Sequence, residues 1–283
     1  MYNIERALDN NFYIKINKDE LNLNKTLDCG QAFRWKQLDS NWWQGIIGNK
    51  IICLGQGTIN NDECIVTNAS DLTEIIKYLN IDMNYTQLIE SIALNTYESK
   101  AYEYSKGIHI LRQDLFETMV TFLMSQCNTM HNIKIIVRNI CTDFGEKIET
   151  EFMGRKFTDF AFPSLEKLSE CSVEDFKKCR MGFRADFLYD MIKNINDNPK
   201  LLDDIANANY NESIYLLKQF NGIGDKVANC ISLFGLHHVE AFPIDTHMRQ
   251  IINREYNGNI DIQRYKGIAG IIQQYMFYYE TFN

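Results

Sequence analysis

The spacing of apolar residues predicts a β-rich first quarter of the chain and a helical remainder. Short runs rich in aromatic and β-branched residues are typical of strands. We expect extended segments at 11–16, 32–36, 42–47, 50–55 and 64–67. Gly48-Asn49 lies between two of these runs and predicts a two-residue hairpin turn.

From Asp71 onward the apolar period changes from two residues to about 3.6. Asp71 stands as a capping residue before apolar positions 72, 75, 76 and 79, which predicts a helix. We expect further helices near 84–94, 97–107, 113–126, 129–143, 164–170, 173–179, 184–196, 211–220, 225–236, 245–256 and 262–280. The fold class is therefore α+β, with an N-terminal antiparallel β domain (1–105, with flanking helices) followed by a mostly α-helical body (106–283).

Composition narrows the protein class. No apolar run reaches the roughly 18 residues that a membrane span needs, and the polar start of the chain is unlike a signal peptide. We expect a cytoplasmic monomer without membrane contact. The eight cysteines contain no C-x-x-C pair, and none follows Cys230, which argues against a zinc knuckle and a C-terminal iron–sulfur cluster. We expect no cofactor or metal, although the backbone carbonyls of 220–224 could hold a cation.

The most informative segment is L-x-x-F-x-G-I-G-x-K-V-A-x-C at 217–230. Gly222 and Gly224, with one apolar residue between them, permit a tight reversal between two helices, and Ile223 would fill the groove between them. Amides at the start of the second helix can hold a DNA phosphate, aided by the helix dipole. We predict a DNA-backbone-binding hairpin at about 211–236; a plain helical turn is the alternative.

Lys226 lies in the first turn of the second helix, where a cation is unfavourable for the helix dipole. It is either a solvated surface lysine or an amine kept partly neutral by its surroundings so that it can act as a nucleophile. Downstream, Asp245 precedes a predicted helix and can cap it. A carboxylate there could also stabilise a developing cation on a sugar, and the two roles are compatible.

Gly-Ile-Gly-Asp-Lys226-Val-Ala, with Pro-Ile-Asp245-Thr-His247 downstream, resembles the helix–hairpin–helix DNA glycosylases, in which a lysine at this position marks the bifunctional members. Four further segments resemble the 8-oxoguanine DNA glycosylase/lyase family within that superfamily. They are Cys-Gly-Gln-Ala-Phe-Arg-Trp at 29–35, Phe-Leu-Met-Ser-Gln-Cys-Asn at 122–128, Met-Gly-Phe-Arg-Ala at 181–185 and the C-terminal segment 267–277. The resemblance runs from about residue 10 to the end of the chain.

The resemblance implies a DNA glycosylase with AP lyase activity whose partner is double-stranded DNA containing 8-oxoguanine. Lys226 would attack C1′ of an extruded nucleotide and form a Schiff base, from which β-elimination nicks the strand. Asp245 would stabilise the cationic sugar or the ammonium. Extruding the base costs a few kcal/mol.

The resemblance also implies a pocket for the extruded base. Phe277 would stack on one face, and Cys230, as a thiolate paired with the lysine, could lie against the other. The Gly30 carbonyl would accept the N7 hydrogen of 8-oxoguanine, and Gln273 would read the pairing edge. Three alternatives stay open: Phe277 as simple core, Gly30 as a strand-entry turn, and Gln273 on a solvated face with Gln274 in its place.

The same resemblance implies the DNA contacts. Phe183 would wedge the base stack, Arg184 would reach the orphaned base, and Asn128 is a second gap-filling candidate. His247 and the hairpin amides would hold phosphates. Human-type members carry an arginine that reads the opposite cytosine where Asn132 stands here, so we expect relaxed opposite-base specificity.

Two other functions compete with this one: a glycosylase for other damaged purines, and a non-catalytic helix–hairpin–helix DNA-binding module. The formal net charge of -8 also argues against a nucleic-acid partner, since such proteins usually carry a basic surplus. The octet 177–184 contains four positive residues and no negative one, around the proposed wedge. We therefore expect a narrow DNA footprint with few phosphate contacts.

Overall fold

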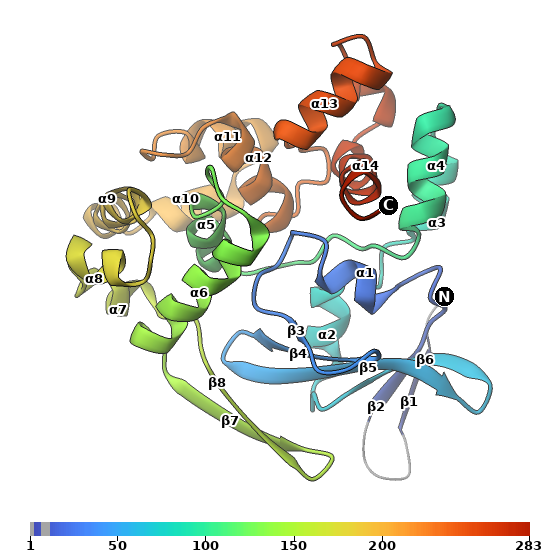
Figure 1. Ribbon diagram of the computed structural model, residues 1–283, viewed down its shortest axis with the longest axis horizontal. Helices are drawn as coiled ribbons and strands as arrows, with labels where there is room; N and C mark the ends of the chain where they lie inside the picture. The colour runs from blue at the N-terminus through green and yellow to red at the C-terminus, as the bar shows by residue number, and fades with distance from the viewer. Residues whose placement is uncertain (1–2, 7–11) are drawn as a thin grey trace.

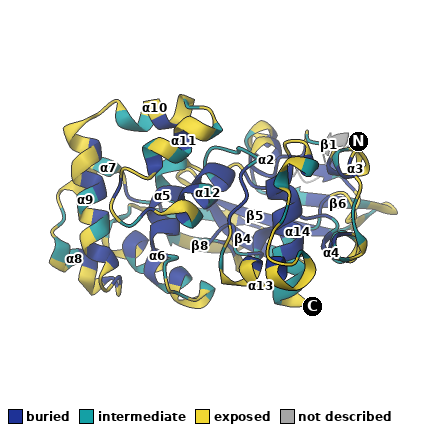
Figure 2. Ribbon diagram, turned by 90° about the horizontal axis from the view of Figure 1, so that it is seen from above, coloured by how far each residue is buried: buried dark blue, intermediate teal, exposed yellow. Residues whose placement is uncertain are grey.

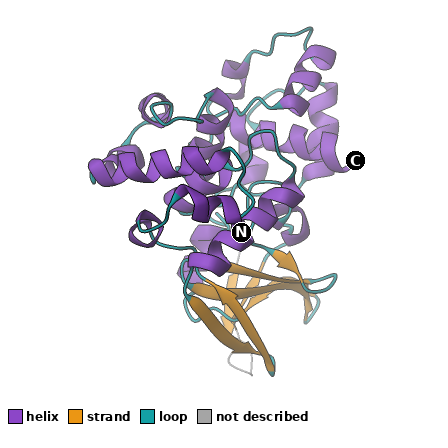
Figure 3. Cartoon of the chain, turned by 60° about the vertical axis from the view of Figure 1, so that its left-hand side comes forward, coloured by secondary structure: helices purple, strands orange, loops and turns teal. Residues whose placement is uncertain are grey.

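The computed structural model describes residues 3–6 and 12–283, and it consists of a sheet layer covered on one side by a large helical body (Figures 1 and 3). Within the described residues, the main sheet is antiparallel with strand order β1-β2-β6-β5-β4-β3. Its strands are β1 (Asn3–Arg6), β2 (Phe12–Lys15), β3 (Lys36–Gln37), β4 (Trp42–Ile47), β5 (Lys50–Ile59) and β6 (Asp62–Thr67). The predicted order of an antiparallel β domain followed by a helical body is confirmed.

Local turn chemistry sets the register of the sheet. Gly48 has φ +56° and, with Asn49, joins β4 to β5 so that Ile47 pairs with Lys50, as the hairpin signal predicts. One face of the sheet packs against α2 (Leu72–Tyr78) around a core that includes Ile52. The predicted extended segment at 11–16 forms β2 from residue 12; residue 11 lies outside the described residues.

The predicted strand at 32–36 is wrong, because most of it is a loop before the short β3. Gln31 holds this loop from inside the protein. Its side-chain amide donates to the carbonyls of Thr26 and His109, at 2.9 and 2.8 Å, and its oxygen accepts from the Leu111 amide at 2.9 Å. The loop is therefore held by hydrogen bonds of the Gln31 side chain. A strand would instead be held by backbone hydrogen bonds to a neighbouring strand. The short helix α1 (Leu23–Leu27) before the loop carries no clear periodic signal and was not predicted.

The helical body follows the predicted series closely. Its helices are α3 (Tyr85–Glu90), α4 (Thr96–Ser105), α5 (Leu115–Leu123), α6 (Met130–Phe144), α7 (Leu165–Ser169), α8 (Val173–Lys178), α9 (Arg184–Asp197), α10 (Leu201–Asn207), α11 (Tyr210–Leu217), α12 (Asp225–Phe234), α13 (Thr246–Glu255), the 3-10 turn η1 (Ile262–Tyr265) and α14 (Ala269–Phe282). Helices α5, α12 and α14 are largely buried, whereas α8 to α10 expose one face to solvent (Figure 2).

Three features of the body differ from expectation. A hairpin, β7 (Lys147–Phe152) and β8 (Arg155–Phe160), interrupts the helices and projects beside the sheet, where the ring centroid of Phe152 lies 5.6 Å from that of Trp42 (Figure 1). Helix α10 was not predicted. The predicted helix at 262–280 divides into η1 and α14, because Lys266 and Gly267 both adopt left-handed backbone conformations.

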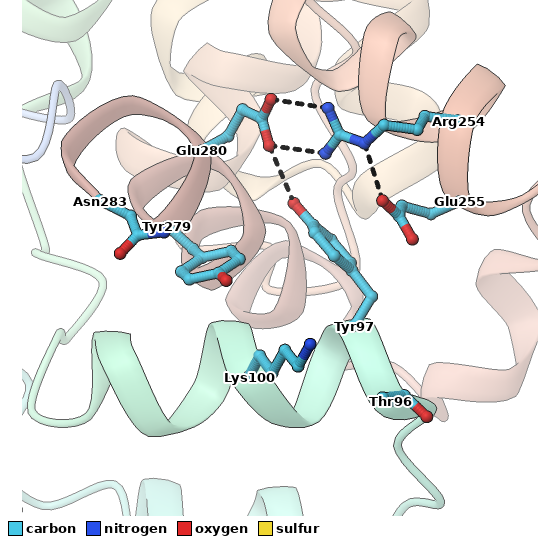
Figure 4. A pocket seen from close by; sticks show the side chains of 8 residues that line it. All are labelled: Thr96, Tyr97, Lys100, Arg254, Glu255, Tyr279, Glu280 and Asn283. Atoms are coloured by element: carbon cyan, nitrogen blue, oxygen red, sulfur yellow. Dashed lines mark hydrogen bonds and ion pairs between the residues drawn. The ribbon is translucent and has the colours of Figure 1, made fainter.

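Helix α14 carries part of the site and is held between α4 and α13. Arg254 of α13 donates two hydrogen bonds to the Glu280 carboxylate of α14, at 2.9 and 2.8 Å (Figure 4). The hydroxyl of Tyr97, on α4, reaches the same carboxylate at 3.4 Å. These contacts fix the rotation of α14 and thus direct its opposite face toward the site. In the described part of the chain, no helix is long and apolar enough to cross a membrane.

Candidate active site

A groove of about 680 Å³ gathers most of the predicted site residues from five separate segments. It lies between the α5–α6 turn, the α11–α12 hairpin and the facing parts of α13 and α14. An inner cavity of about 50 Å³ shares part of its lining with the groove. The predicted residues on the groove are Gly30, Asn128, Gly222, Gly224, Lys226, Asp245, His247 and Phe277, and those on the inner cavity are Gly30, Lys226, Cys230, Asp245, Gln273 and Phe277.

The hairpin has the geometry that its glycines predict. Gly222 has φ +84°, and a Cβ there would lie 2.6 Å from the Phe187 ring, so the position excludes any side chain. Ile223 is buried between the two helices. Gly224 begins α12 without a side-chain cap, which leaves the first-turn amides for an anion in the groove.

Lys226 is half-buried on the wall shared by the groove and the inner cavity. Its Nζ donates a hydrogen bond of 3.0 Å to Ser125 Oγ and lies 5.7 Å from the centroid of the Phe122 ring. A solvated surface lysine would not have these neighbours. The amine is therefore held where the groove meets the inner cavity.

Asp245 combines the two roles that the sequence allowed. Its Oδ1 accepts from the Met248 amide at 2.8 Å and caps α13. The same side chain lines both cavities together with Lys226. The cap orients the carboxylate and leaves its second oxygen available to the site.

The inner cavity distinguishes Gln273 from Gln274. Gln274 donates a hydrogen bond of 2.9 Å to the Cys29 carbonyl and so has a structural role. Gln273 is 4% exposed, and within the described chain its Oε1 is buried without a hydrogen-bond partner. A buried acceptor without a donor is costly unless a ligand supplies one. This excludes the solvated-face alternative for Gln273.

Gly30 and Phe277 form the opposite part of the cavity. Gly30 has φ +83°, and a Cβ there would lie 3.4 Å from the Phe277 ring and 3.1 Å from Met130 Sδ. Phe277 is only partly buried, and its ring meets that of His247 edge-on with centroids 5.9 Å apart. The ring therefore faces the groove and is not simple core.

Cys230 lies in the inner cavity, as predicted, and is buried there. Burial raises the pKa of its thiol, and the neighbouring Lys226 offsets this only in part. The thiol therefore stays protonated near neutral pH.

The predicted wedge residue Phe183 is exposed, whereas the neighbouring Arg184 is buried. Phe183 is 53% exposed, and its ring lies 4.5 Å from the Arg184 guanidinium. Arg184 is 8% exposed and donates to backbone carbonyls of Gln126, Cys127 and Met181. Its donors satisfy the Gln126 and Cys127 carbonyls beyond the end of α5, and the contact of Arg184 with an orphaned base stays a prediction.

Asn128 lines the groove and also stabilises the turn after α5. Its Nδ2 donates to the Met124 carbonyl at 3.1 Å, and its Oδ1 accepts from the Thr129 amide at 3.0 Å. His247 is exposed on the other side of the groove. Both side chains therefore lie where bound DNA could reach them.

The basic octet is less positive than its sequence indicates. Lys177 pairs with Glu174 at 2.7 Å, and Lys178 pairs with Asp175 at 2.8 Å. Because both acidic partners precede the octet in the chain, counting charges within 177–184 missed them. With Arg184 buried, the local surplus is small and the predicted footprint becomes narrower still.

Sequence reasoning missed the contact between Lys226 and Ser125. The two residues are 101 positions apart, and no local pattern links them. Ser125 lay within a segment recognised for its resemblance to the gap-filling part of the family, without a role of its own. Its place beside the amine depends on how α5 packs against α12.

Known proteins resemble this chain over its whole length. The family model for the N-terminal domain of 8-oxoguanine DNA glycosylase matches residues 13–119. The N-glycosylase/DNA lyase OGG1 of Arabidopsis thaliana is 28% identical, over 85% of this chain and 67% of its own.

Two solved structures of the Clostridium acetobutylicum 8-oxoguanine glycosylase/lyase have the same fold. The apo-form is 30% identical, with a TM-score of 0.85 over 99% of this chain and 98% of its own. The complex with double-stranded DNA containing cytosine opposite 8-oxoG is 29% identical, with a TM-score of 0.85 over 99% and 97%. The chain belongs to the 8-oxoguanine DNA glycosylase/lyase family.

Proposed function

We propose that this protein is a bifunctional DNA repair enzyme that excises 8-oxoguanine from double-stranded DNA and then nicks the strand. One observation carries the proposal: Lys226 lies on the wall of the inner cavity together with Asp245, Gln273 and Phe277. A non-catalytic hairpin module needs the backbone amides alone and has no use for these four side chains in one cavity.

In the first step, the neutral amine of Lys226 attacks C1′ of the extruded nucleotide. The glycosidic bond breaks, and the base leaves with its electron pair and takes up a proton. The Asp245 carboxylate stabilises the positive charge that develops on the sugar. The C1′–O4′ bond then breaks, one proton passes from the nitrogen to O4′, and a protonated Schiff base between Nζ and C1′ is left.

In the second step, the Schiff base acts as an electron sink. Loss of a proton from C2′ allows the 3′ phosphate to leave, which breaks the strand by β-elimination. A single amine thus supports both activities, whereas an activated water could only release the base. This chemistry draws on side chains alone, so we propose that no cofactor takes part; a cation at the 220–224 carbonyls stays a prediction.

The damaged base would enter from the groove, with its pairing edge at the inner cavity. The buried Oε1 of Gln273 needs a donor, and the pairing edge of a guanine-type base offers N–H groups. The Gly30 carbonyl would accept the N7 hydrogen that distinguishes 8-oxoguanine from guanine. Phe277 and the neutral Cys230 thiol would lie on the two faces of the ring.

We further propose that the enzyme acts as a monomer inside the cell, since one chain carries every residue assigned above. Phe183 would enter the base stack, and His247 with the hairpin amides would hold phosphates. The Arg184 guanidinium is bound to the Gln126 and Cys127 carbonyls, and Asn132 occurs in place of an arginine. Both points support relaxed discrimination among bases opposite the lesion.

Borohydride trapping on duplex DNA containing 8-oxoguanine tests the proposal. We expect a covalent protein–DNA complex with the natural protein, none with Lys226→Gln, and full trapping with Lys100→Gln as the matched control. Lys100 is exposed in a different pocket, between α4 and α14 (Figure 4). Base release without trapping would show a monofunctional glycosylase, and binding without release would show a plain DNA-binding module.

A further inference from the structure

The hydroxyl of Ser125 occupies a defined position beside the Lys226 amine. Ser125 Oγ donates its hydrogen to the Phe122 carbonyl at 2.7 Å. A serine hydroxyl has one hydrogen, so toward Lys226 Nζ, at 3.0 Å, it can only accept. One N–H of the lysine therefore points at Ser125, whether the group is an ammonium or an amine.

This contact limits rotation about the last bond of the lysine side chain. Nζ is tetrahedral, so directing one N–H at Ser125 confines its other positions to two directions. In the neutral amine, one of these directions is the lone pair that must reach C1′. Fixing the N–H thus favours orientations of the amine in which the lone pair faces the cavity. Fewer unreactive orientations then compete with the one that can attack C1′.

The turn that carries Ser125 is itself held in place. Gln126 Nε2 donates to the Leu123 carbonyl at 3.1 Å. Arg184 donates to the Gln126 and Cys127 carbonyls, including one bond of 2.9 Å and one of 3.1 Å. Cys127 has φ +46°, a left-handed conformation that costs energy in a non-glycine residue. The Arg184 hydrogen bonds offset that cost and hold the turn that carries Ser125 in one conformation.

We infer that Ser125 is a positioning residue for Schiff-base formation: it orients the Lys226 amine for attack on the sugar. The inference rests on the proposed function, because it needs Lys226 to be the nucleophile. Ser125 does not transfer the proton in this scheme, since its own hydrogen is bound to the Phe122 carbonyl. Its effect is on the rate of attack and not on the binding of DNA.

Single-turnover borohydride trapping on 8-oxoguanine DNA tests this inference, together with the dissociation constant for the same DNA. We expect Ser125→Ala to form the trapped complex about tenfold more slowly, the factor that corresponds to roughly 1.4 kcal/mol. The dissociation constant should stay unchanged. Ser125→Thr keeps the hydroxyl and should restore most of the rate, which a merely structural role would not require.

Ser169→Ala is the matched control, because Ser169 Oγ makes the same kind of bond to a carbonyl three residues back, that of Glu166, at 2.6 Å. It is exposed and far from the lysine in the sequence, and it should trap at the natural rate. A natural rate in Ser125→Ala, a loss confined to DNA affinity, or no recovery in Ser125→Thr would each overturn the inference. Absence of trapping by the natural protein would instead overturn the proposed function, and the inference with it.

Discussion

The side-chain amide of Gln274 donates a hydrogen bond of 2.9 Å to the carbonyl oxygen of Cys29, across 245 positions of the chain. The last helix thereby holds the loop that precedes Gly30. Because Phe277 also projects from α14, the two parts of the base cavity keep a constant separation. The inner cavity thus depends on the contact between the loop at Cys29 and Gly30 and the C-terminal helix α14.

Gln274→Leu should destabilise the protein and slow excision. The substitution leaves the buried Cys29 carbonyl without its donor, which costs about 1–3 kcal/mol. Gly30 would then lose its fixed distance from Phe277. Urea unfolding gives the stability change, and single-turnover release of 8-oxoguanine gives the rate. Gln250→Leu, at an exposed position on α13, should change the stability by less than about 0.5 kcal/mol.

Gln273→Leu should behave in the opposite way in the unfolding experiment. The Oε1 of Gln273 has no hydrogen-bond partner within the described chain, so removing this oxygen breaks no hydrogen bond among the described residues. We expect the free energy of unfolding to stay the same or rise slightly, while excision of 8-oxoguanine falls at least about tenfold through loss of edge contacts. A loss of stability as large as that of Gln274→Leu would refute the assignment of Gln273 to the ligand.

Asp245→Asn should separate catalysis from folding. An asparagine oxygen can still accept from the Met248 amide, so the cap of α13 and the thermal stability should persist. Loss of the negative charge should slow Schiff-base trapping by about a hundredfold or more, with DNA affinity largely retained. Unchanged turnover would remove Asp245 from the mechanism. Asp245→Ala should in addition lose about 1 kcal/mol of stability with the cap.

His237 should make stability depend on pH below neutrality. Burial, together with the nearby Arg112, lowers the pKa of His237 from 6.5 to about 4. Between pH 6.5 and about pH 4, the unfolded chain therefore binds a proton at this histidine, whereas the folded protein does not. The contribution of His237 is fully present above pH 6.5 and is lost as the pH falls toward 4, by at most about 1.4 kcal/mol per pH unit.

Urea unfolding at several pH values between 7 and 4.5 measures this effect. His237→Asn should lose less stability on acidification than the natural protein. Asparagine tolerates the left-handed backbone at this position, where φ is +61°. His131→Asn, on an exposed face of α6, is the matched control and should follow the natural curve. Parallel curves for His237→Asn and the natural protein would contradict the prediction.

Turns and helix caps that depend on a few neighbouring residues were predictable from the sequence. The helix–hairpin–helix depends on Gly222, Ile223 and Gly224, whose backbone freedom and single apolar side chain permit one tight reversal. Gly48-Asn49 likewise set the register of β4 and β5. Asp245 was predicted as a cap because capping is a contact within one turn. These inferences held because the interacting atoms are close in the sequence.

The hairpin β7–β8 shows why a local pattern can fail. Half of the positions in the two strands are exposed, and Phe152 is the buried residue that packs against the sheet. β7 does alternate exposed with less exposed positions, but only Ile148 and Phe152 of its less exposed side are apolar, so the period-two signal is short and weak. The carbonyl partners of Arg184 could not be predicted for a different reason: they lie 57 and 58 positions earlier in the chain, where no local pattern links them to it.

The sequence by itself determined the order of the layers, the hairpin, and the identity of Lys226 and Asp245 as candidates, because each depends on local backbone geometry or on a short residue pattern. Only the tertiary structure decided which of Gln273 and Gln274 donates to the Cys29 carbonyl, that burial raises the pKa of the Cys230 thiol, and that Ser125 contacts the Lys226 amine. Those outcomes depend on burial and on contacts between distant segments, and desolvation acts on a side chain only once packing has removed it from water.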